Sequence, residues 1–327
     1  MLAFVVRRLL VAIPVVLLAT VVAFVLVTAR GDPLADLRHR PGVSTETIHA
    51  LEHEYHLDES KPARYLGWLW DFVRGDWGHS YRTEQPVTQM IADGAWNTFL
   101  LVGVTVLLSG ALAMFLGVVS AVRQYSAFDY VATSFSYFGY SMPDFFFALL
   151  LQLGLVVLLR EQFGVHWFFV QGKYRVGHEG ELGDLARHMV LPVLTLMLTS
   201  VAAWSRYQRS SMLEALRADY IRTARAKGVP RGRIIRRHAL RNALVPFVTV
   251  VAVDTGVLLG GVVVVERIFA WPGLGLVFFQ ALSNSDYPVL LAWMAVATVF
   301  VVLANLAADL LYGVLDPRIR VPGMVAA

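Results

Sequence analysis

The sequence contains no cysteine. Disulfide bonds and thiolate metal sites are therefore excluded, and the redox compartment stays undecided. Charged residues are also scarce: they make up 16% of the 327 residues, whereas about 25% is usual in soluble domains. Apolar residues make up 57%, above the roughly 45–50% of a soluble domain. This composition predicts an integral membrane protein.

Six apolar segments are long enough to cross a bilayer, which takes about 20 helical residues. They are too long and continuous for barrel strands of about 9–11 residues, so the predicted fold is all-α, within a single transmembrane domain covering 1–327. The first run has 21 residues, more than the roughly 7–15 of a signal peptide, so we expect an uncleaved anchor. The predicted spans are approximately 9–29, 98–121, 131–159, 188–205, 242–265 and 288–312.

Basic residues gather in the segment 206–241. It holds eleven Lys or Arg against two acids, a net charge of +9, although the whole chain is only +4. If both termini are cytoplasmic, the inner segments are more than twice as dense in Lys and Arg as the outer ones, so we predict that both termini are inside. The segment 30–97 is then extracytoplasmic. A basic excess beside membrane spans is typical of cytoplasmic loops, and it does not indicate nucleic-acid binding.

The basic segment also has helical periodicity. Residues 210–227 contain no Pro or Gly, and apolar residues recur on one helical face. Gly228 and Pro230 then end the helix, and 231–240 can form a second one. Such a helix–break–helix has two interpretations: an amphipathic helix on anionic lipid, or a rigid element that fits a groove on a soluble partner. Charge and amphipathicity alone favour neither.

Several segments resemble one protein family. SSMLEALRADYIRTARAKGVPRGRIIRRHALRNALVPFVTV resembles the cytoplasmic "EAA" loop of ATP-binding-cassette (ABC) importer permeases, and more narrowly that of the B-type subunit of dipeptide/oligopeptide permeases. FVVRRLLVAIP, GDPLADL, GYSMPDFFFALLL, VERIFAWPGLGLVFFQALSNSDYPVL and NLAADLLYGVLDPRIR agree in the same order. The resemblance runs nearly end to end.

This resemblance implies a type I ABC importer permease fold in a bacterial cytoplasmic membrane, surrounded by lipid. It implies a heterodimer with a C-type permease subunit, two cytosolic ATPases below, and an extracytoplasmic binding protein that delivers peptide from above. The chain itself would bind no cofactor, because ATP and Mg would be used by the partner subunits. No nucleic acid is implied.

The resemblance also implies that the EAA loop supplies a helix that sits in a cleft of one ATPase. Carried onto this chain, the candidate coupling residues are Asp219, Tyr220, Arg222, Thr223, Ala224, Arg225, Ala226, Lys227 and Gly228. One position departs from the general pattern: Arg222 stands where many permeases carry an acid, six residues before the glycine. We expect Gly228→Asp or Ala224→Arg to abolish ATP-driven uptake while the subunit still inserts.

Catalytic motifs are missing. The sequence has no G-x-x-x-x-G-K-[ST] phosphate loop, G-x-S-x-G or H-E-x-x-H, so ATP hydrolysis by this chain is not expected. Energy would come from a partner or from an ion gradient. The alternative functions are therefore an ion-gradient-driven carrier and a membrane scaffold that does not transport.

Three acids fall within the predicted spans. Asp144 follows Pro143 at an expected break, and Asp309 lies near the inner end of the sixth span; for both we expect local capping or pairing. Asp254 lies near the middle of the fifth span, where an acid costs about 2.5–3.5 kcal/mol. It must therefore face protein or water. It either lines the translocation pathway or makes a polar contact with a neighbouring helix.

The outer segments carry weaker signals. Residues 45–57 predict a short surface helix that Ser44 or Thr45 would cap. His49, His53 and His56 have helical spacing there, but an exposed metal site is the less favoured interpretation. Trp271 is expected to anchor a turn at the membrane interface.

Overall fold

The computed structural model describes residues 2–29, 31–38, 43–157, 161, 162, 164 and 169–315. These residues form helices, turns and loops; no β-strand occurs among them, only an isolated bridge between His79 and Pro86. The all-α prediction is therefore confirmed. The chain divides into two compact units: unit 1 is Met1–Asn97 with Gly273–Leu303, and unit 2 is Thr98–Pro272 with Ala304–Ala327.

Unit 1 combines long apolar helices with short amphipathic ones. A buried cluster joins α1, the start of α5, α13 and α14, and three aromatic side chains of α4, Tyr65, Trp68 and Phe72, pack against it. Its helices are α1 (Leu2–Ala29), α2 (Ala35–Arg38), α3 (Thr45–Glu54), α4 (Lys61–Arg74), the first part of α5 (Val87–Val122), α13 (Leu274–Asn284) and most of α14 (Tyr287–Leu315).

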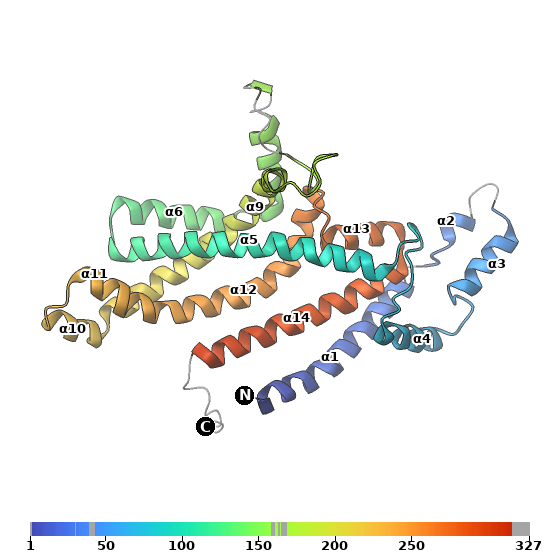
Figure 1. Ribbon diagram of the computed structural model, residues 1–327, viewed down its shortest axis with the longest axis horizontal. Helices are drawn as coiled ribbons and strands as arrows, with labels where there is room; N and C mark the ends of the chain where they lie inside the picture. Colours follow the sequence, from blue (N-terminus) through green and yellow to red (C-terminus); the bar gives the residue numbers. More distant parts are fainter. Residues whose placement is uncertain are drawn as a thin grey trace. The chain divides into compact units, whose positions relative to one another are not determined.

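Unit 2 is built around α9, which packs against α12 and α6. In Figure 1 the helices α5, α6, α9 and α12 extend toward the end where α10 and α11 lie. Its elements are the rest of α5, α6 (Ala127–Ser141), α7 (Asp144–Leu150), the π-helix η1 (Leu151–Val157), α9 (Leu182–Arg217), α10 (Asp219–Ala226), α11 (Arg231–Arg233), the π-helix η2 (Ile234–Ala239) and α12 (Leu240–Ile268).

Four helical stretches of the described chain are long and apolar enough to cross a membrane: Leu10–Ala29, Val87–Val122, Leu182–Arg217 and Arg231–Gly256. Shorter apolar helices cover Asp144–Gly154, Leu274–Asn284 and Tyr287–Leu303. The prediction of six spans thus stays a prediction.

The third predicted span is broken where the sequence indicated. Met142 has extended backbone angles (φ −91°, ψ 123°), because the ring of the following proline disfavours the helical conformation for the residue before it. α6 ends at Ser141 and α7 begins at Asp144. The expected break at Pro143 is confirmed, and the segment consists of two helical pieces.

The segments predicted to lie outside contain more helix than the sequence indicated. α3 begins at Thr45, and Ser44 Oγ accepts a hydrogen bond from the Thr47 amide at 3.1 Å, as the capping prediction required. α13 occupies a stretch to which no helix was assigned. The expectation for Trp271 was wrong: its side chain is fully buried in the core of unit 2, together with Phe269.

α5 and α9 approach very closely at Gly117. A Cβ atom there would lie 2.7 Å from Gln208 Cβ and 2.8 Å from the Ser205 carbonyl oxygen. No side chain fits at such distances, so glycine at this position permits the contact that holds the C-terminal half of α9 against α5.

A candidate coupling surface

The basic segment begins as a continuation of α9, which ends only at Arg217. Ala218 then adopts extended angles (φ −66°, ψ 151°), and α10 begins at Asp219. The prediction of one helix over 210–227 was therefore wrong. In a continuous helix Met212 and Ile221 would lie on opposite faces, since nine residues correspond to two and a half turns. The break at Ala218 lets both side chains be buried.

α10 is anchored by its apolar face. Ile221 and Ala224 are 1% and 8% exposed, and they belong to a buried cluster with Met212 of α9, Ile234 of η2 and residues of α5 and α12. Ala224 thus packs inside the chain's own core. Of the nine candidate coupling residues, Ala224 is the one that is buried.

Glycine ends this helical element in the way the sequence predicted. Gly228 has φ +73°, in the left-handed region that other residues rarely adopt. Its amide donates to the Arg225 carbonyl at 2.9 Å, and the Val229 amide donates to the Ala224 carbonyl at 3.1 Å. These bonds satisfy the last carbonyls of α10. The chain then turns sharply into α11.

The remaining candidate coupling residues are exposed. Arg222 Nη2 lies 3.3 Å from Asp219 Oδ1, but these side chains are 83% and 92% exposed, so the ion pair contributes little. Tyr220 is the large apolar side chain of α10 that remains half exposed. The exposed members are Asp219, Tyr220, Arg222, Thr223, Arg225, Ala226, Lys227 and Gly228.

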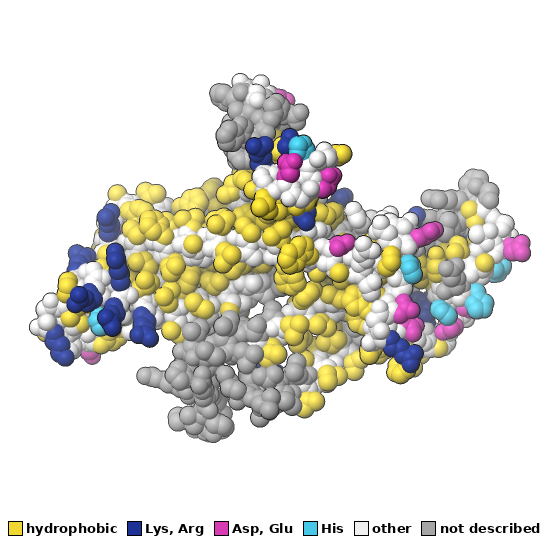
Figure 2. Space-filling view, viewed as in Figure 1, with side chains coloured by type: hydrophobic (Ala, Val, Ile, Leu, Met, Phe, Trp, Pro, Cys, Tyr) yellow, Lys and Arg dark blue, Asp and Glu magenta, His cyan; other side chains and the backbone are white. Residues whose placement is uncertain are grey.

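Positive charge continues beyond α10. Figure 2 shows Lys and Arg side chains gathered over the end of unit 2 that carries α10 and α11. The exposed arginines of α11, η2 and the start of α12 add to this surface: Arg231, Arg233, Arg236, Arg237 and Arg241. We call the exposed residues of 217–241 the basic surface. It is suited to an acidic partner or to anionic groups.

A charged pair fixes the base of this surface. Arg209 of α9 donates from Nε and Nη2 to the two carboxylate oxygens of Asp129, at 2.7 and 2.8 Å. Asp129 is buried at the start of α6 and also accepts from the Tyr125 amide at 3.0 Å. The Arg209 guanidinium lowers the pKa of Asp129 below its ordinary value. The bidentate geometry therefore ties α9 firmly to α6.

Two of the three acids within the predicted spans bond to α9. Trp204 Nε1 donates to Asp254 Oδ2 at 2.8 Å, and Thr199 Oγ1 donates to Asp144 Oδ1 at 2.9 Å. Pairing of Asp144 with a neighbouring polar group is thereby confirmed. Asp254 has a contact of the same kind and is partly exposed. The side chain of Asp309 lies outside the described residues.

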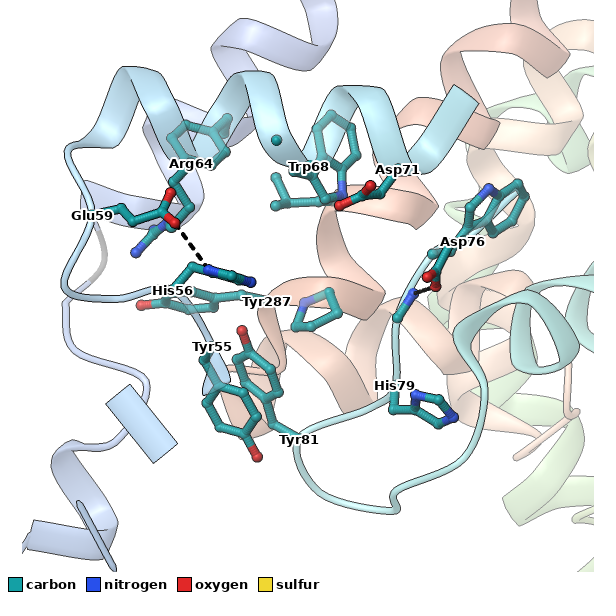
Figure 3. Close-up of a pocket in the computed structure, with 16 residues that line it drawn as sticks. Tyr55, His56, Glu59, Arg64, Trp68, Asp71, Asp76, His79, Tyr81 and Tyr287 are labelled. Atoms are coloured by element: carbon teal, nitrogen blue, oxygen red, sulfur yellow. Dashed lines mark hydrogen bonds and ion pairs between the residues drawn. The ribbon is translucent and has the colours of Figure 1, made fainter. Parts of the chain in front are cut away.

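Unit 1 contains a separate cavity of about 410 Å³. Figure 3 shows it between α4, the end of α3 and the loop that carries His79 and Tyr81. Tyr55 stacks on Tyr81 with ring centroids 3.8 Å apart, and burial raises the pKa of Tyr81. Arg64 and Asp71 of α4 line the same cavity. Its walls combine aromatic rings with charges of both signs.

Two histidines, one in α3 and one just after it, pair locally. His49 Nδ1 lies 2.9 Å from Glu52, and His56 Nδ1 lies 3.0 Å from Glu59. Within the part of the chain that the structure describes, no three His, Cys, Asp or Glu side chains come together as a metal site would require.

Glu266 and Asp286 are among the buried acids that were not singled out from the sequence. Glu266 is fully buried and accepts from Thr98 Oγ1 at 2.6 Å in unit 2. Asp286 accepts from Ser80 Oγ and, at 3.1 Å, from the Tyr81 amide in unit 1. Both lie between the fifth and sixth predicted spans, where the sequence predicted only a turn at the membrane interface. Their position next to apolar runs was the one feature of the sequence that could have indicated their burial.

The sequence matches a known family over nearly its whole length. Residues 113–321 match the family described as "Binding-protein-dependent transport system inner membrane component", and residues 1–102 match the model of its N-terminal region. The chain belongs to this family. It is an ABC-transporter permease, a membrane subunit without catalysis of its own, and ATP hydrolysis resides in separate ATPase subunits.

Curated relatives cover this permease almost completely. The oligopeptide transport system permease protein AppB of Bacillus subtilis is 39% identical over 98% of this chain and 100% of its own length. The dipeptide transport system permease protein DppB of Escherichia coli K12 is 36% identical over 98% and 99%. Among solved structures, an amino acid ABC transporter described with histidines matches with a TM-score of 0.54 at 16% identity, covering 69% of this chain and 94% of that one. This last similarity supports the fold alone.

Proposed function

We propose that this chain is the B-type membrane subunit of an ATP-driven peptide importer in a bacterial cytoplasmic membrane. It crosses the membrane six times with both termini inside, and pairs with a C-type permease subunit. Two cytosolic ATPases, which use ATP and Mg, drive the transport, and an extracytoplasmic binding protein delivers the peptide. The chain itself binds no cofactor.

The peptide substrate is inferred from the relatives. AppB and DppB are named as oligopeptide and dipeptide permeases, and both align over essentially the whole chain. Similarity of this extent includes the membrane segments that form a pathway, and is not confined to the loop that any ABC permease needs. We therefore assign di- and oligopeptides as the substrate class.

The burial of the apolar face of α10 is the observation that supports the proposed coupling role. A helix that binds a lipid surface inserts an apolar face into it. The apolar face of α10, with Ile221 and Ala224, is instead buried in the chain's own core, and it presents mainly polar and cationic groups. This arrangement suits a groove on a soluble protein better than a bilayer. We infer that the exposed residues of 219–228 contact an ATPase, and that Ala224 positions the helix from within.

We further propose that Asp254 lines the translocation pathway. A carboxylate near the centre of a span is costly unless it faces protein or water. Its bond to Trp204 offsets part of this cost, and its partial exposure leaves it accessible to a positively charged group in a water-filled path.

Reconstitution separates this function from its alternatives. The chain is placed in vesicles with its C-type partner, with or without the ATPases and the binding protein, and uptake of labelled peptide is measured. We expect uptake only in the complete system with ATP and Mg. Uptake driven by an ion gradient without ATPases would identify a carrier, and failure of the complete system to import would favour a scaffold.

Two glycines close together provide a matched test of the coupling surface. Gly228 requires φ +73°, whereas Gly232 has no left-handed strain and no atom within 4 Å of an added Cβ. Valine at 228 costs about 1–3 kcal/mol of backbone strain, and it is a sharper probe than aspartate, which tolerates the left-handed region. We expect Gly228→Val to lose ATP-dependent uptake while Gly232→Val retains it. Both variant subunits should still insert into the membrane. Equal uptake by the two variants would contradict the coupling role.

A further inference from the structure

α4 has two apolar faces, and the described chain covers one of them. Tyr65, Trp68 and Phe72 pack against the buried cluster of unit 1. Leu66, Trp70 and Val73 remain 63%, 59% and 74% exposed. These three residues are spaced i, i+4 and i+7, so they form one continuous stripe along the helix. We call them the outer stripe.

The third side of α4 is polar. Arg64, Gly67 and Asp71, also spaced over two turns, line the cavity in unit 1 (Figure 3). Around the helix, the apolar arc is therefore divided between the protein core and the outer stripe, and the polar arc borders the cavity. A helix with this division is strongly amphipathic, although part of its apolar arc has no cover within the unit.

The contacts between α4 and α1 indicate how deep α4 lies. The Tyr65 hydroxyl lies 3.0 Å from Thr20 Oγ1, and its ring meets that of Phe24 edge-on at 5.4 Å. Thr20 and Phe24 lie nine and five residues before Ala29, where the apolar run of α1 ends. At 1.5 Å per residue these contacts are about 14 and 8 Å before the end of the run. α4 thus packs beside the outer half of a membrane-crossing helix (Figure 1).

The chemistry of the outer stripe fits that depth. Trp70 carries the guanidinium of Arg74 over its ring at 4.2 Å. Tryptophan and arginine are common where hydrocarbon meets headgroups, because each combines an apolar body with a polar end. α1 exposes Val22, Val25 and Leu26 in the same stretch, so apolar side chains of two helices are exposed at this depth.

We propose that α4 is an interfacial helix, with Leu66, Trp70 and Val73 inserted into the outer leaflet of the bilayer and Arg64, Gly67 and Asp71 on the aqueous side. The surrounding lipid is thus the partner of the outer stripe. This arrangement fixes the level of the cavity just outside the hydrocarbon. It does not depend on which solute the permease transports.

The absence of cysteine makes a direct test possible. Single cysteines replace Leu66, Trp70 or Val73, and matched controls carry Gly67→Cys or Asp71→Cys. Gly67 has no atom within 4 Å of an added Cβ, and Asp71 is exposed, so both controls are tolerated. Each variant is purified with its own partner subunits in cysteine-free form, spin-labelled, and returned to phospholipid vesicles. Collision rates with oxygen and with a water-soluble nickel chelate are then measured.

We expect oxygen collisions to dominate at 66, 70 and 73, and nickel collisions to dominate at 67 and 71. The depth parameter, which is the logarithm of the ratio of oxygen to nickel collision rates, should therefore be positive in the first set and negative in the second. Nickel access at all five positions would overturn the proposal, because the stripe would then face water. Immobile labels at 66, 70 and 73 that neither reagent reaches would also overturn it, because a protein would then cover the stripe. A positive depth parameter at these three positions alone supports lipid.

Discussion

The Arg209–Asp129 pair should hold the basic surface on unit 2, and its contribution can be measured. Arg209→Ala leaves a buried carboxylate with the Tyr125 amide at 3.0 Å and the Thr133 hydroxyl at 3.5 Å. Breaking a fully buried pair costs about 3–5 kcal/mol. The Arg209 side chain is 28% exposed, so screening reduces the expected loss of unfolding free energy to about 2–3 kcal/mol. Asp129→Asn keeps an acceptor oxygen and should cost about 1–2 kcal/mol.

A double-mutant cycle isolates the pair from other effects of each substitution. Unfolding of the purified permease in mixed micelles is followed by circular dichroism for Arg209→Ala, Asp129→Ala and the double variant. We expect a coupling energy above about 1 kcal/mol. The exposed Arg222–Asp219 pair in the same segment serves as control, with an expected coupling below about 0.5 kcal/mol. Equal coupling in the two cycles would refute the structural role assigned to Arg209 and Asp129.

The same pair predicts how stability depends on pH. Because Arg209 lowers the pKa of Asp129 in the folded protein, the folded state binds this proton less tightly than the unfolded state. The stabilisation is therefore complete above the ordinary aspartate pKa of 3.8 and is lost as pH falls through the lowered folded value. Asp129→Asn should remove this component of acid sensitivity. An unchanged acid profile in that variant would mean that the pair contributes no linked stability.

Two further substitutions test the packing and the pathway. Gly117→Ala places a Cβ 2.7–2.9 Å from atoms of α9 and should cost about 1–3 kcal/mol of unfolding free energy. In the control, Gly110→Ala in the same helix, the new Cβ meets no atom within 4 Å, so this variant should be neutral or stabilised by up to about 1 kcal/mol. Equal stability of the two variants would refute the close approach of α5 and α9. Asp254→Asn retains an acceptor for Trp204 and should lower uptake of cationic peptides more than that of anionic ones. Equal effects on both peptide classes would leave Asp254 as a structural contact only.

The sequence predicted those features that depend on local chemistry. Low charge and long apolar runs indicated an all-α membrane protein, Pro143 indicated the break between α6 and α7, and the pair Ser44 and Thr45 indicated the start of α3. In each case the composition or a local residue type is enough to favour one backbone conformation over the others. Gly228 belongs to the same group, because its left-handed backbone is rarely adopted by other residues.

The break at Ala218 could not be predicted in this way. No Pro or Gly stands there, and the periodicity of 210–227 favoured one continuous helix. The break follows from tertiary packing, because Ile221 and Met212 can share one core only if the helix changes direction between them. The burial of Trp271 and the pairing of Glu266 with Thr98 have the same origin, since each depends on segments distant in the sequence.

For the candidate site, the sequence indicated the segment and its charge but not which side of α10 faces outward. Ala224 was grouped with the contact residues, and its burial changes its role to anchoring. A pattern of apolar spacing cannot distinguish a face packed on the chain's own core from one offered to a partner. That distinction required the positions of α9 and η2.

One mechanical consequence follows from the length of α9. The stretch from Thr199 to Arg217 is helical throughout and contains no Pro or Gly. It carries the donors to Asp144, Asp254 and Asp129 in turn, on Thr199, Trp204 and Arg209. A helix without an interior break moves approximately as one body, so these three contacts are mechanically linked. A displacement of this part of α9 as a whole therefore changes the geometry of all three contacts together.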